Sequence, residues 1–160
     1  MNTKAAKISI PKLIFACLIS LAAGGLGSLL AGNSFEIYQY LEKPPFSPPA
    51  IIFPIVWTIL YILMGIASYL IFIEHTDESK KALTTYTFYL ILNILWPTAF
   101  FKKGAFLAAL LLLAGQLLLL GACFNSYYHI NKKAAFLMVP TILWSIFAMY
   151  LNVGFLFLNA

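Results

Sequence analysis

Histidine and cysteine, the side chains that most often bind metals or act as nucleophiles, are rare in this 160-residue chain. His75 and His129 lie among polar residues between apolar segments, where we interpret them as solvated. Cys17 and Cys123 are far apart and lack metal-ligand spacing, so we interpret both as small core residues. The sequence has no glycine-rich phosphate loop, nucleophile elbow or zinc motif. Hydrolysis and phosphoryl transfer are therefore not expected.

Ionisable side chains are confined to the amino terminus and to the connections between long apolar segments. The chain is 62% hydrophobic and only 9% charged, with a mean hydropathy of +0.93, whereas a soluble domain carries about 25% charged residues. This composition indicates an integral membrane protein. Because no ionisable group lies within an apolar segment, ion-coupled transport lacks its usual side chains. The net charge of +5 comes from flanking lysines and gives no reason to expect a nucleic-acid partner.

Aromatic and amide side chains recur at helical spacing inside three of the apolar segments. One interpretation is that they only join neighbouring helices and mark the membrane interface. The other is a cavity between helices, with aromatic walls and a few hydrogen-bonding groups, suited to a flat apolar ligand. Pro97 and Pro140, which can bend their helices, favour the cavity. The three stripes are Trp57, Tyr61, Met64, Gly65 and Ser68; Tyr86, Tyr89, Asn93, Trp96 and Phe100; and Pro140, Trp144, Ala148, Leu151, Asn152 and Phe155.

Five apolar segments must position these side chains. A spanning helix needs about 20 mostly apolar residues, because the hydrocarbon core is roughly 30 Å thick. The predicted fold is an all-α integral membrane protein, a five-transmembrane-helix bundle in which residues 1–160 form a single membrane domain. The first segment is longer than the core of a cleaved signal peptide, so we interpret it as a retained helix. The five segments are residues 13–31, 51–73, 83–101, 105–124 and 136–158.

The distribution of lysines predicts the orientation of the chain. Seven of the ten lysines fall at the amino terminus, in residues 74–81 and in residues 125–133. The other three, which include Lys102 and Lys103, fall on the opposite side. By the positive-inside rule, we expect a multi-pass protein of the cell membrane with its amino terminus in the cytoplasm and its carboxyl terminus outside.

The first apolar segment and the connection after it have unusual compositions. Gly24, Ser28 and Gly32 form small-xxx-small pairs, which permit close approach of a neighbouring helix or provide a flat wall for a ligand. The connection 33–50 holds four prolines between positions 44 and 49, so that part cannot be regular helix. Two interpretations remain open, a rigid lid over the mouth of the bundle and a simple connector to the second helix.

Four motifs occur along the chain in a specific order. The first is Lys43-Pro44-Pro45-Phe46-Ser47-Pro48-Pro49, and the second is Phe53-Pro54-Ile55-Val56-Trp57-Thr58-Ile59-Leu60-Tyr61. The third is Leu92-Asn93-Ile94-Leu95-Trp96-Pro97, and the fourth runs from Pro140 through Trp144 and Ala148 to Leu151-Asn152. Together they resemble the TspO/MBR translocator family, once called peripheral benzodiazepine receptors. The resemblance covers essentially the whole chain.

The resemblance implies a five-helix pocket, capped by the first loop, that binds porphyrins such as protoporphyrin IX and haem. It also implies sterol and benzodiazepine-type ligands, membrane lipid as surroundings, a homodimer, and no obligatory cofactor. A light-dependent porphyrin-degrading enzyme and a facilitated transporter of hydrophobic molecules are the alternatives to a binding protein, and we name no catalytic residue and no metal ligand. Asn93 and Asn152 are expected to orient the polar edges of the ligand. From the resemblance and the stripes, the expected ligand-binding residues are Ala23, Pro48, Pro49, Phe53, Trp57, Tyr61, Asn93, Trp96, Phe100, Trp144, Ala148, Leu151 and Asn152.

The chain departs from the family pattern in its first loop and its last helix. Phe46 stands where the family often has tryptophan, and Ile37-Tyr38 replaces a Trp–Tyr pair, so porphyrin chemistry that relies on loop indoles is not supported. Tyr150 has no basic residue after it, and the cholesterol-recognition pattern of animal members requires one. A sterol role is therefore unsupported.

Overall fold

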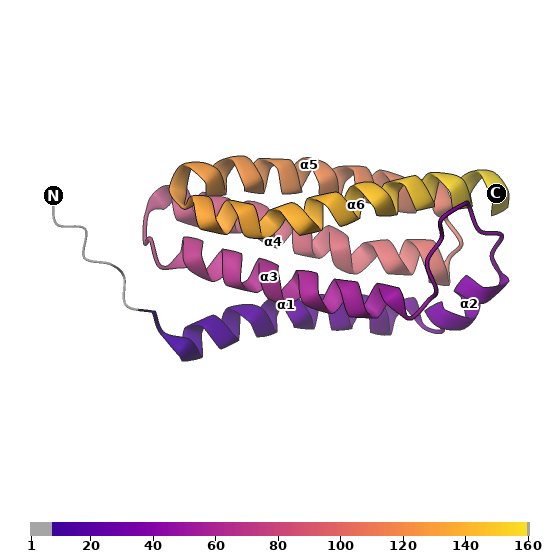
Figure 1. Cartoon of the computed structure of the whole chain (residues 1–160), viewed down its shortest axis with the longest axis horizontal. Coiled ribbons are helices and arrows are strands. Elements are labelled where there is room, and N and C mark those ends of the chain that lie inside the picture. The colour runs from indigo at the N-terminus through magenta and orange to yellow at the C-terminus, as the bar shows by residue number, and fades with distance from the viewer. Residues whose placement is uncertain (1–7, 160) are drawn as a thin grey trace, which may run out of the picture.

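The computed structural model describes residues 8–159, which form six α-helices and one π-helical turn and contain no strand (Figure 1). The all-helical class expected from the sequence is confirmed. Lys4 and Lys7, on which the predicted orientation partly depends, lie outside the described residues. The elements are α1 (Ile10–Ala31), α2 (Ser34–Tyr40), α3 (Ile52–Phe72), α4 (Asp77–Pro97), the π-helical turn η1 (Thr98–Lys102), α5 (Phe106–Ile130) and α6 (Lys132–Asn159).

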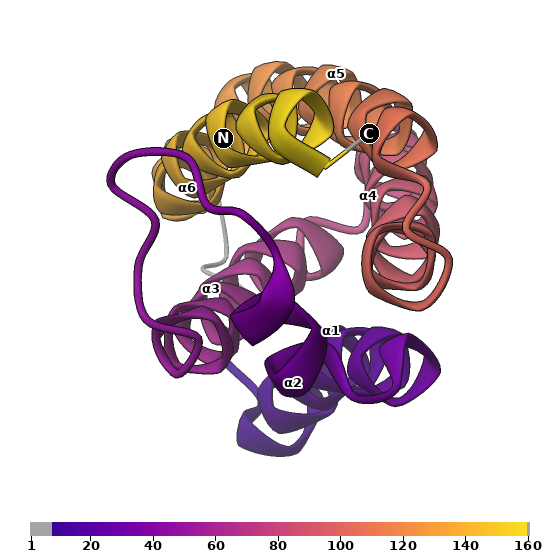
Figure 2. The same ribbon diagram turned by 90° about the vertical axis from the view of Figure 1, so that its right-hand side faces the viewer.

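The long helices stand side by side in a ring. Its order is α1, α4, α5, α6 and α3, and α3 again contacts α1. Figure 2, which looks along the helices, shows α2 and the irregular segment after it lying across one end of the ring. The carboxyl ends of α1 and α4 and the amino end of α3 meet at this end (Figure 1). This arrangement brings the tryptophans of α3 and α4 near the small residues of α1.

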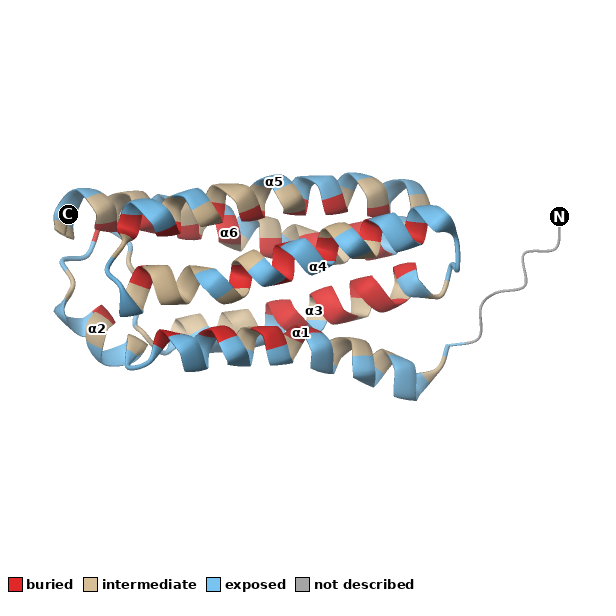
Figure 3. Cartoon of the chain, turned by 180° about the vertical axis from the view of Figure 1, so that it is seen from behind, coloured by how far each residue is buried: buried red, intermediate tan, exposed pale blue. Residues whose placement is uncertain are grey.

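The outer surface of the ring is apolar, and the buried residues face inward (Figure 3). Leu29, Leu118 and Phe157 are 81%, 77% and 81% exposed, respectively. In water such large exposed apolar side chains would be unfavourable, whereas lipid tails can cover them. Polar side chains such as Gln116 and Asn152 are instead almost fully buried within the ring. This distribution fits a protein whose surrounding solvent is the bilayer.

Four helices, α1, α3, α5 and α6, are long and apolar enough to cross a membrane. The remaining long helix, α4, does not meet this criterion although residues 83–101 were expected to span. It begins earlier, at Asp77, and carries four charged residues in its first two turns. Tyrosine, threonine and Asn93 further lower its hydropathy, and its α-helical part ends at Pro97. By length and composition, residues 8–159 contain four candidate spans, and the predicted count of five is not confirmed.

The connection 33–50 is not one irregular loop as expected, because α2 occupies its first half. Residues 41–49, here named the proline segment, remain irregular. A seven-residue helix is marginal by itself and depends on tertiary packing. Tyr38 supplies that packing, since it is 4% exposed and meets the rings of Phe53 and Phe155 edge to face at 5.3 and 5.8 Å between centroids. The sequence pattern did not indicate that Tyr38 is buried against these rings.

Candidate functional site

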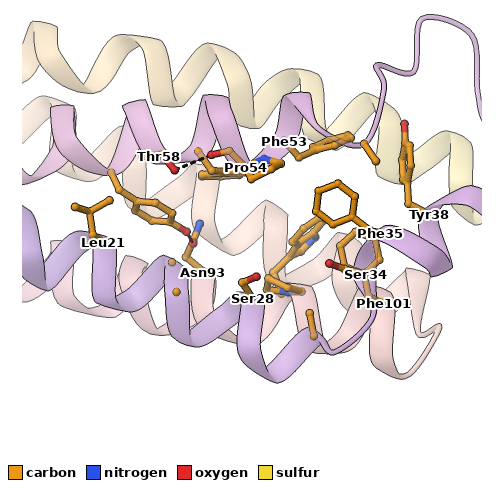
Figure 4. A pocket seen from close by; sticks show the side chains of 18 residues that line it. Leu21, Ser28, Ser34, Phe35, Tyr38, Phe53, Pro54, Thr58, Asn93 and Phe101 are labelled. Atoms are coloured by element: carbon orange, nitrogen blue, oxygen red, sulfur yellow. Dashed lines mark hydrogen bonds between the residues drawn. The ribbon is translucent and has the colours of Figure 1, made fainter.

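A cavity of about 340 Å³, here named the main cavity, lies among α1, α2, α3 and α4 near the proline segment. In Figure 4 it runs from Leu21 and Asn93 at its inner end to Phe35 and Tyr38 at the other. Its volume falls in the range of small-molecule sites, roughly 300–1,000 Å³. The wall residues are Leu21, Gly24, Gly25, Ser28 and Ala31 of α1; Ser34, Phe35 and Tyr38 of α2; Ala50; Phe53, Pro54, Trp57, Thr58 and Tyr61 of α3; Asn93, Trp96 and Pro97 of α4; and Phe101 of η1.

The structure divides the expected site residues into three groups. Five of them line the main cavity, namely Phe53, Trp57, Tyr61, Asn93 and Trp96. A neighbouring small cavity of about 20 Å³ shares Phe53 and Trp96 and is also lined by Phe100, Ala148, Leu151 and Asn152. Ala23, Pro48, Pro49 and Trp144 line neither cavity. The walls from α6 expected for the pocket thus border only the small cavity.

The residues outside both cavities have other contacts. Ala23 is buried in the helix core, and the Pro48 carbonyl accepts a hydrogen bond from the Tyr38 hydroxyl at 2.7 Å. Trp144 packs edge to face against Phe53, with ring centroids 6.1 Å apart. Its indole nitrogen is buried with no hydrogen-bond partner among the described residues. Trp144 therefore lies behind a wall residue of the main cavity.

The wall from α1 was the part of the site least specified by the sequence. Its small residues fit both close packing and a flat wall, and the structure contains both. At Gly24 a β-carbon would overlap the ring of Tyr61, and at Gly65 it would lie 2.5 Å from the Cα of Cys17. One residue beyond Gly24, the position of a β-carbon on Gly25 has no atom within 4 Å. The helices α1 and α3 are therefore in close contact at Gly24 and Gly65, and there is open space beside Gly25.

Two pairs of aromatic rings form flat surfaces in the cavity walls. Trp57 stacks on Tyr61 with centroids 5.6 Å apart and an interplanar angle of 30°. Trp96 stacks on Phe100 at 5.2 Å and 27°. Both pairs are spaced i, i+4; Trp57 and Tyr61 lie on α3, whereas Trp96 of α4 stacks on Phe100 of the π-helical turn that follows it. The walls of the main cavity can therefore offer ring faces to a flat apolar molecule.

The amide of Asn93 is occupied by hydrogen bonds within the protein. Its Oδ1 accepts from the Tyr61 hydroxyl, and its Nδ2 donates to the Tyr89 hydroxyl at 3.2 Å and to Gln116 Oε1 at 3.1 Å. A buried amide without partners is costly, so this network stabilises the junction of α3, α4 and α5. Both N–H groups of Asn93 are thereby unavailable to a ligand.

A second buried polar pair joins α4 to α6. Trp96 Nε1 donates to Asn152 Oδ1 at 3.0 Å, and Asn152 Nδ2 donates to the Phe106 carbonyl at 3.0 Å. These bonds fix the Trp96 ring at the boundary between the two cavities. The indole nitrogen of Trp96, like the amide of Asn93, already has its partner.

The π-helical turn positions two phenylalanines. Because η1 is wider than an α-helix, the Lys103 N–H donates to the carbonyl of Thr98, five residues earlier, at 3.1 Å. Phe100 and Phe101, adjacent in sequence, both border the small cavity, and Phe101 also borders the main cavity. Pro97, which lacks an N–H, directly precedes this turn; the sequence indicated only that it could bend its helix.

Acid–base and metal chemistry have no side chains in these walls. No acidic, basic, histidine or cysteine side chain lines either cavity. Within residues 8–159, no three potential metal ligands gather in one place. The walls offer ring faces, aliphatic contacts, hydroxyl groups and the Trp57 indole, which are groups suited to binding an apolar ligand.

The proline segment is fastened to α6. Asn159 Nδ2 donates to the Glu42 carbonyl and Asn159 Oδ1 accepts from the Glu42 N–H, both at 2.9 Å. The Tyr150 hydroxyl donates to the Pro45 carbonyl, also at 2.9 Å. Two side chains of α6, those of Asn159 and Tyr150, thus form hydrogen bonds with the backbone of the proline segment at two separate points.

The segment is also held from inside. Pro44 is buried against Gly154, where a β-carbon would overlap the proline ring. Burial raises the pKa of Tyr38 above its ordinary value, so its hydroxyl stays protonated and donates to Pro48. Ser47 Oγ donates to the Pro44 carbonyl at 2.7 Å and tightens the turn. The proline segment is therefore an ordered cap on this end of the ring.

Comparisons with known proteins identify relatives over nearly the whole chain. The model of the TspO/MBR family matches residues 15–158. The tryptophan-rich protein TspO of Archaeoglobus fulgidus is 34% identical over 155 residues, which cover 96% of this chain and all of that protein. The translocator protein of Bos taurus is 36% identical, covering 89% of this chain and 86% of its own. The tryptophan-rich sensory protein of Cereibacter sphaeroides is 32% identical, and the match covers 83% of this chain and 82% of that protein.

Proposed function

The chain belongs to the TspO/MBR family, and we propose that its main cavity binds a flat hydrophobic tetrapyrrole such as protoporphyrin IX or haem. The chain is an all-helical, multi-pass membrane protein of this family. The observation that carries the proposal is a cavity of about 340 Å³ with ring faces on α3 and α4 and small residues on α1. Ring faces and small residues together suit a flat apolar ligand.

Stacking and apolar contact supply most of the binding energy in this proposal. Each aromatic pair is worth about 0.5–1.5 kcal/mol beyond the area that it buries. The absence of charged side chains from the walls also favours an apolar ligand body, because a buried charge without a partner is costly. The family alternatives, passage of the ligand across the membrane and its light-dependent breakdown, would use the same cavity.

The proposal includes five spans, with α4 as the fifth. Residues 82–101 of α4 and η1 carry no charge, and their 20 residues match the length that a spanning helix needs, about 20. The polar side chains that lower the hydropathy of α4 include Tyr86, Tyr89 and Asn93, which are all buried. Residues 1–160 then form one membrane domain with the amino terminus in the cytoplasm and the proline segment outside. The proposed assembly is a homodimer surrounded by lipid.

Titration of the purified protein with protoporphyrin IX in the dark tests the proposal. Binding is followed by the absorbance and fluorescence of the porphyrin itself. We expect saturable 1:1 binding, and we expect Trp57→Phe to weaken it about tenfold, since a large ring face is lost. Trp144→Phe is the matched comparison, because this indole lines neither cavity, and its effect should be smaller.

Two results would contradict the proposal. One is no saturable binding by the folded wild-type protein. The other is a folded Trp57→Phe and Trp96→Phe double variant that binds with wild-type affinity. Illumination of the complex, with analysis of products at substoichiometric protein, separates binding alone from porphyrin breakdown.

A further inference from the structure

We infer that the ligand of the main cavity enters sideways from the bilayer, between α1 and α3, and not through the proline segment. The inference rests on the proposed function and adds the route and the class of ligand. The ligand is a bilayer-soluble flat amphiphile that enters with its apolar edge leading and keeps its polar edge near the opening.

The opening lies where wall residues of the cavity are also exposed on the outer surface. Gly25 and Ser28 of α1 and Pro54 and Thr58 of α3 have both properties, and so does Phe35 of α2 at the end of the cavity under the cap. Gly25 borders open space, since a β-carbon there would have no atom within 4 Å. Thr58 Oγ1 is bonded to the Pro54 carbonyl of its own helix at 2.7 Å, so it does not bridge to α1. The four residues of α1 and α3 are here named the rim, and exposed apolar side chains of the same two helices, such as Leu29 and Ile55, lie near them in sequence.

The opening is limited on its inner side by tight helix contact. Gly24 lies directly against the Tyr61 ring, and Gly65 lies against the backbone of Cys17. Neither glycine has room for a β-carbon. The seam between α1 and α3 is therefore closed toward the amino end of α1 and open beside the cavity.

The alternative route, through the cap, is closed by several independent contacts. Asn159 and Tyr150 of α6 bind the backbone of Glu42 and Pro45. On the inner side Tyr38 binds the Pro48 carbonyl and packs between aromatic rings. Entry from the aqueous side would require these bonds to break together, whereas the rim is open without any change.

The free polar groups of the cavity indicate which edge of the ligand is polar. The N–H groups of Asn93, at the inner end, and of Trp96, at the boundary with the small cavity, already have partners. The hydroxyls of Ser28 and Ser34 and the Trp57 indole nitrogen make no hydrogen bond with any residue in 8–159. Ser28 belongs to the rim and Ser34 to α2, so these two hydroxyls can bind acceptors on the outer edge of the ligand. Because no cation lines the cavity, ionised groups of the ligand remain at the opening.

Gly25→Leu tests the route, because it adds a large side chain at the rim at a position where the β-carbon has no atom within 4 Å. Gly121→Leu is the matched control, since Gly121 is also exposed and unobstructed but lies on α5, away from both cavities. Protoporphyrin IX is mixed with each protein in lipid nanodiscs, and the rates of association and dissociation are followed by stopped-flow fluorescence. For Gly25→Leu we expect the rates of association and of dissociation both to fall about fivefold or more, because a narrowed opening slows entry and exit alike, whereas Gly121→Leu keeps wild-type rates.

A second pair of variants tests the cap. Tyr150→Phe and Asn159→Ala remove contacts of the proline segment without touching the main cavity. We expect association at the wild-type rate in both. Faster association in these variants, or a Gly25→Leu protein with an unchanged association rate, would overturn the lateral route while leaving the binding function intact. Failure of the wild-type protein to bind protoporphyrin IX would instead refute the proposed function.

Discussion

Asn93 illustrates how a polar side chain in a membrane helix can serve structure before it serves a ligand. It donates to Tyr89 and Gln116 and accepts from Tyr61, so three helices meet at one amide. In hydrocarbon an unpaired amide is strongly unfavourable, and this explains why a residue that lines the cavity is bonded inward. The groups left for a ligand are the less conspicuous ones, Trp57 and the serines of α1 and α2.

The adjacent glycines Gly24 and Gly25 allow a sharp test of this packing. Gly24→Ala places a methyl group in the Tyr61 ring, which is buried and bonded to Asn93, so the ring cannot move freely. We expect a loss of about 1–3 kcal/mol in unfolding free energy, seen as a lower Tm by circular dichroism in detergent. Gly25→Ala is the control, and the higher helix propensity of alanine should leave its Tm equal or slightly raised. Equal Tm values for the two variants would show that the Gly24 contact does not constrain Tyr61.

Among the elements, α2 and the proline segment have the least regular sequence and yet are ordered by many contacts. Their bonds come from α6, more than 100 residues later in the chain, because Glu42 pairs with Asn159 and Pro45 pairs with Tyr150. Prolines lower the entropy cost of ordering such a segment. The cap is therefore held by α6, which otherwise borders only the small cavity.

Asn159→Ala tests this attachment directly. The Glu42 N–H loses its acceptor, and a hydrogen bond of about 1 kcal/mol corresponds to roughly fivefold faster opening. We expect the Glu42 amide to exchange with deuterium faster by about that factor, measured by mass spectrometry on peptides of the segment. Asn33→Ala is the matched control, since its side chain bonds only the exposed Glu36. Unchanged exchange at Glu42 in Asn159→Ala would mean that other contacts hold the segment.

The molecule as a whole places its polar groups inside and its apolar groups outside, which suits lipid as solvent. Its two ends differ, since one carries the cap and the main cavity and the other carries most of the described lysines, among them Lys80 and Lys132. In the orientation that we propose from the positive-inside rule, the end with Lys80 and Lys132 faces the cytoplasm. The cavity would lie in the outer half of the membrane.

Chemical labelling of single-cysteine variants measures this topology and tests whether α4 crosses the membrane. In a background with both native cysteines replaced by serine, we expect a membrane-impermeant maleimide to label Phe46→Cys and Lys103→Cys on intact cells. His75→Cys and His129→Cys should be labelled only after permeabilisation. All four positions are exposed, so access through the membrane alone decides the labelling. If His75→Cys and Lys103→Cys are labelled from the same side, then α4 does not span and the five-span proposal is wrong.

The helical class, the membrane setting and the family could be predicted because they depend on local properties. Runs of apolar residues, the positions of lysines and the proline motif are all visible along the chain. The stripe with Trp57 and Tyr61 was also found, since i, i+4 spacing fixes a helix face before any partner is known. The helix α4 begins at Asp77, before the apolar segment 83–101, because its first turn carries exposed charged residues and a search for apolar residues does not detect such a turn.

Only the tertiary structure decided which faces enclose a space and which polar groups are free. The glycines of α1 are compatible with close packing and with a cavity wall. Which of the two each glycine forms depends on where α3 lies against it. Trp144 shares a helix face with Ala148, yet it packs behind Phe53 because α3 covers it. Hydrogen bonds between Asn93 and Gln116, or between Glu42 and Asn159, join residues far apart in sequence. Such contacts arise only when the ring of helices closes, so sequence periodicity cannot determine them.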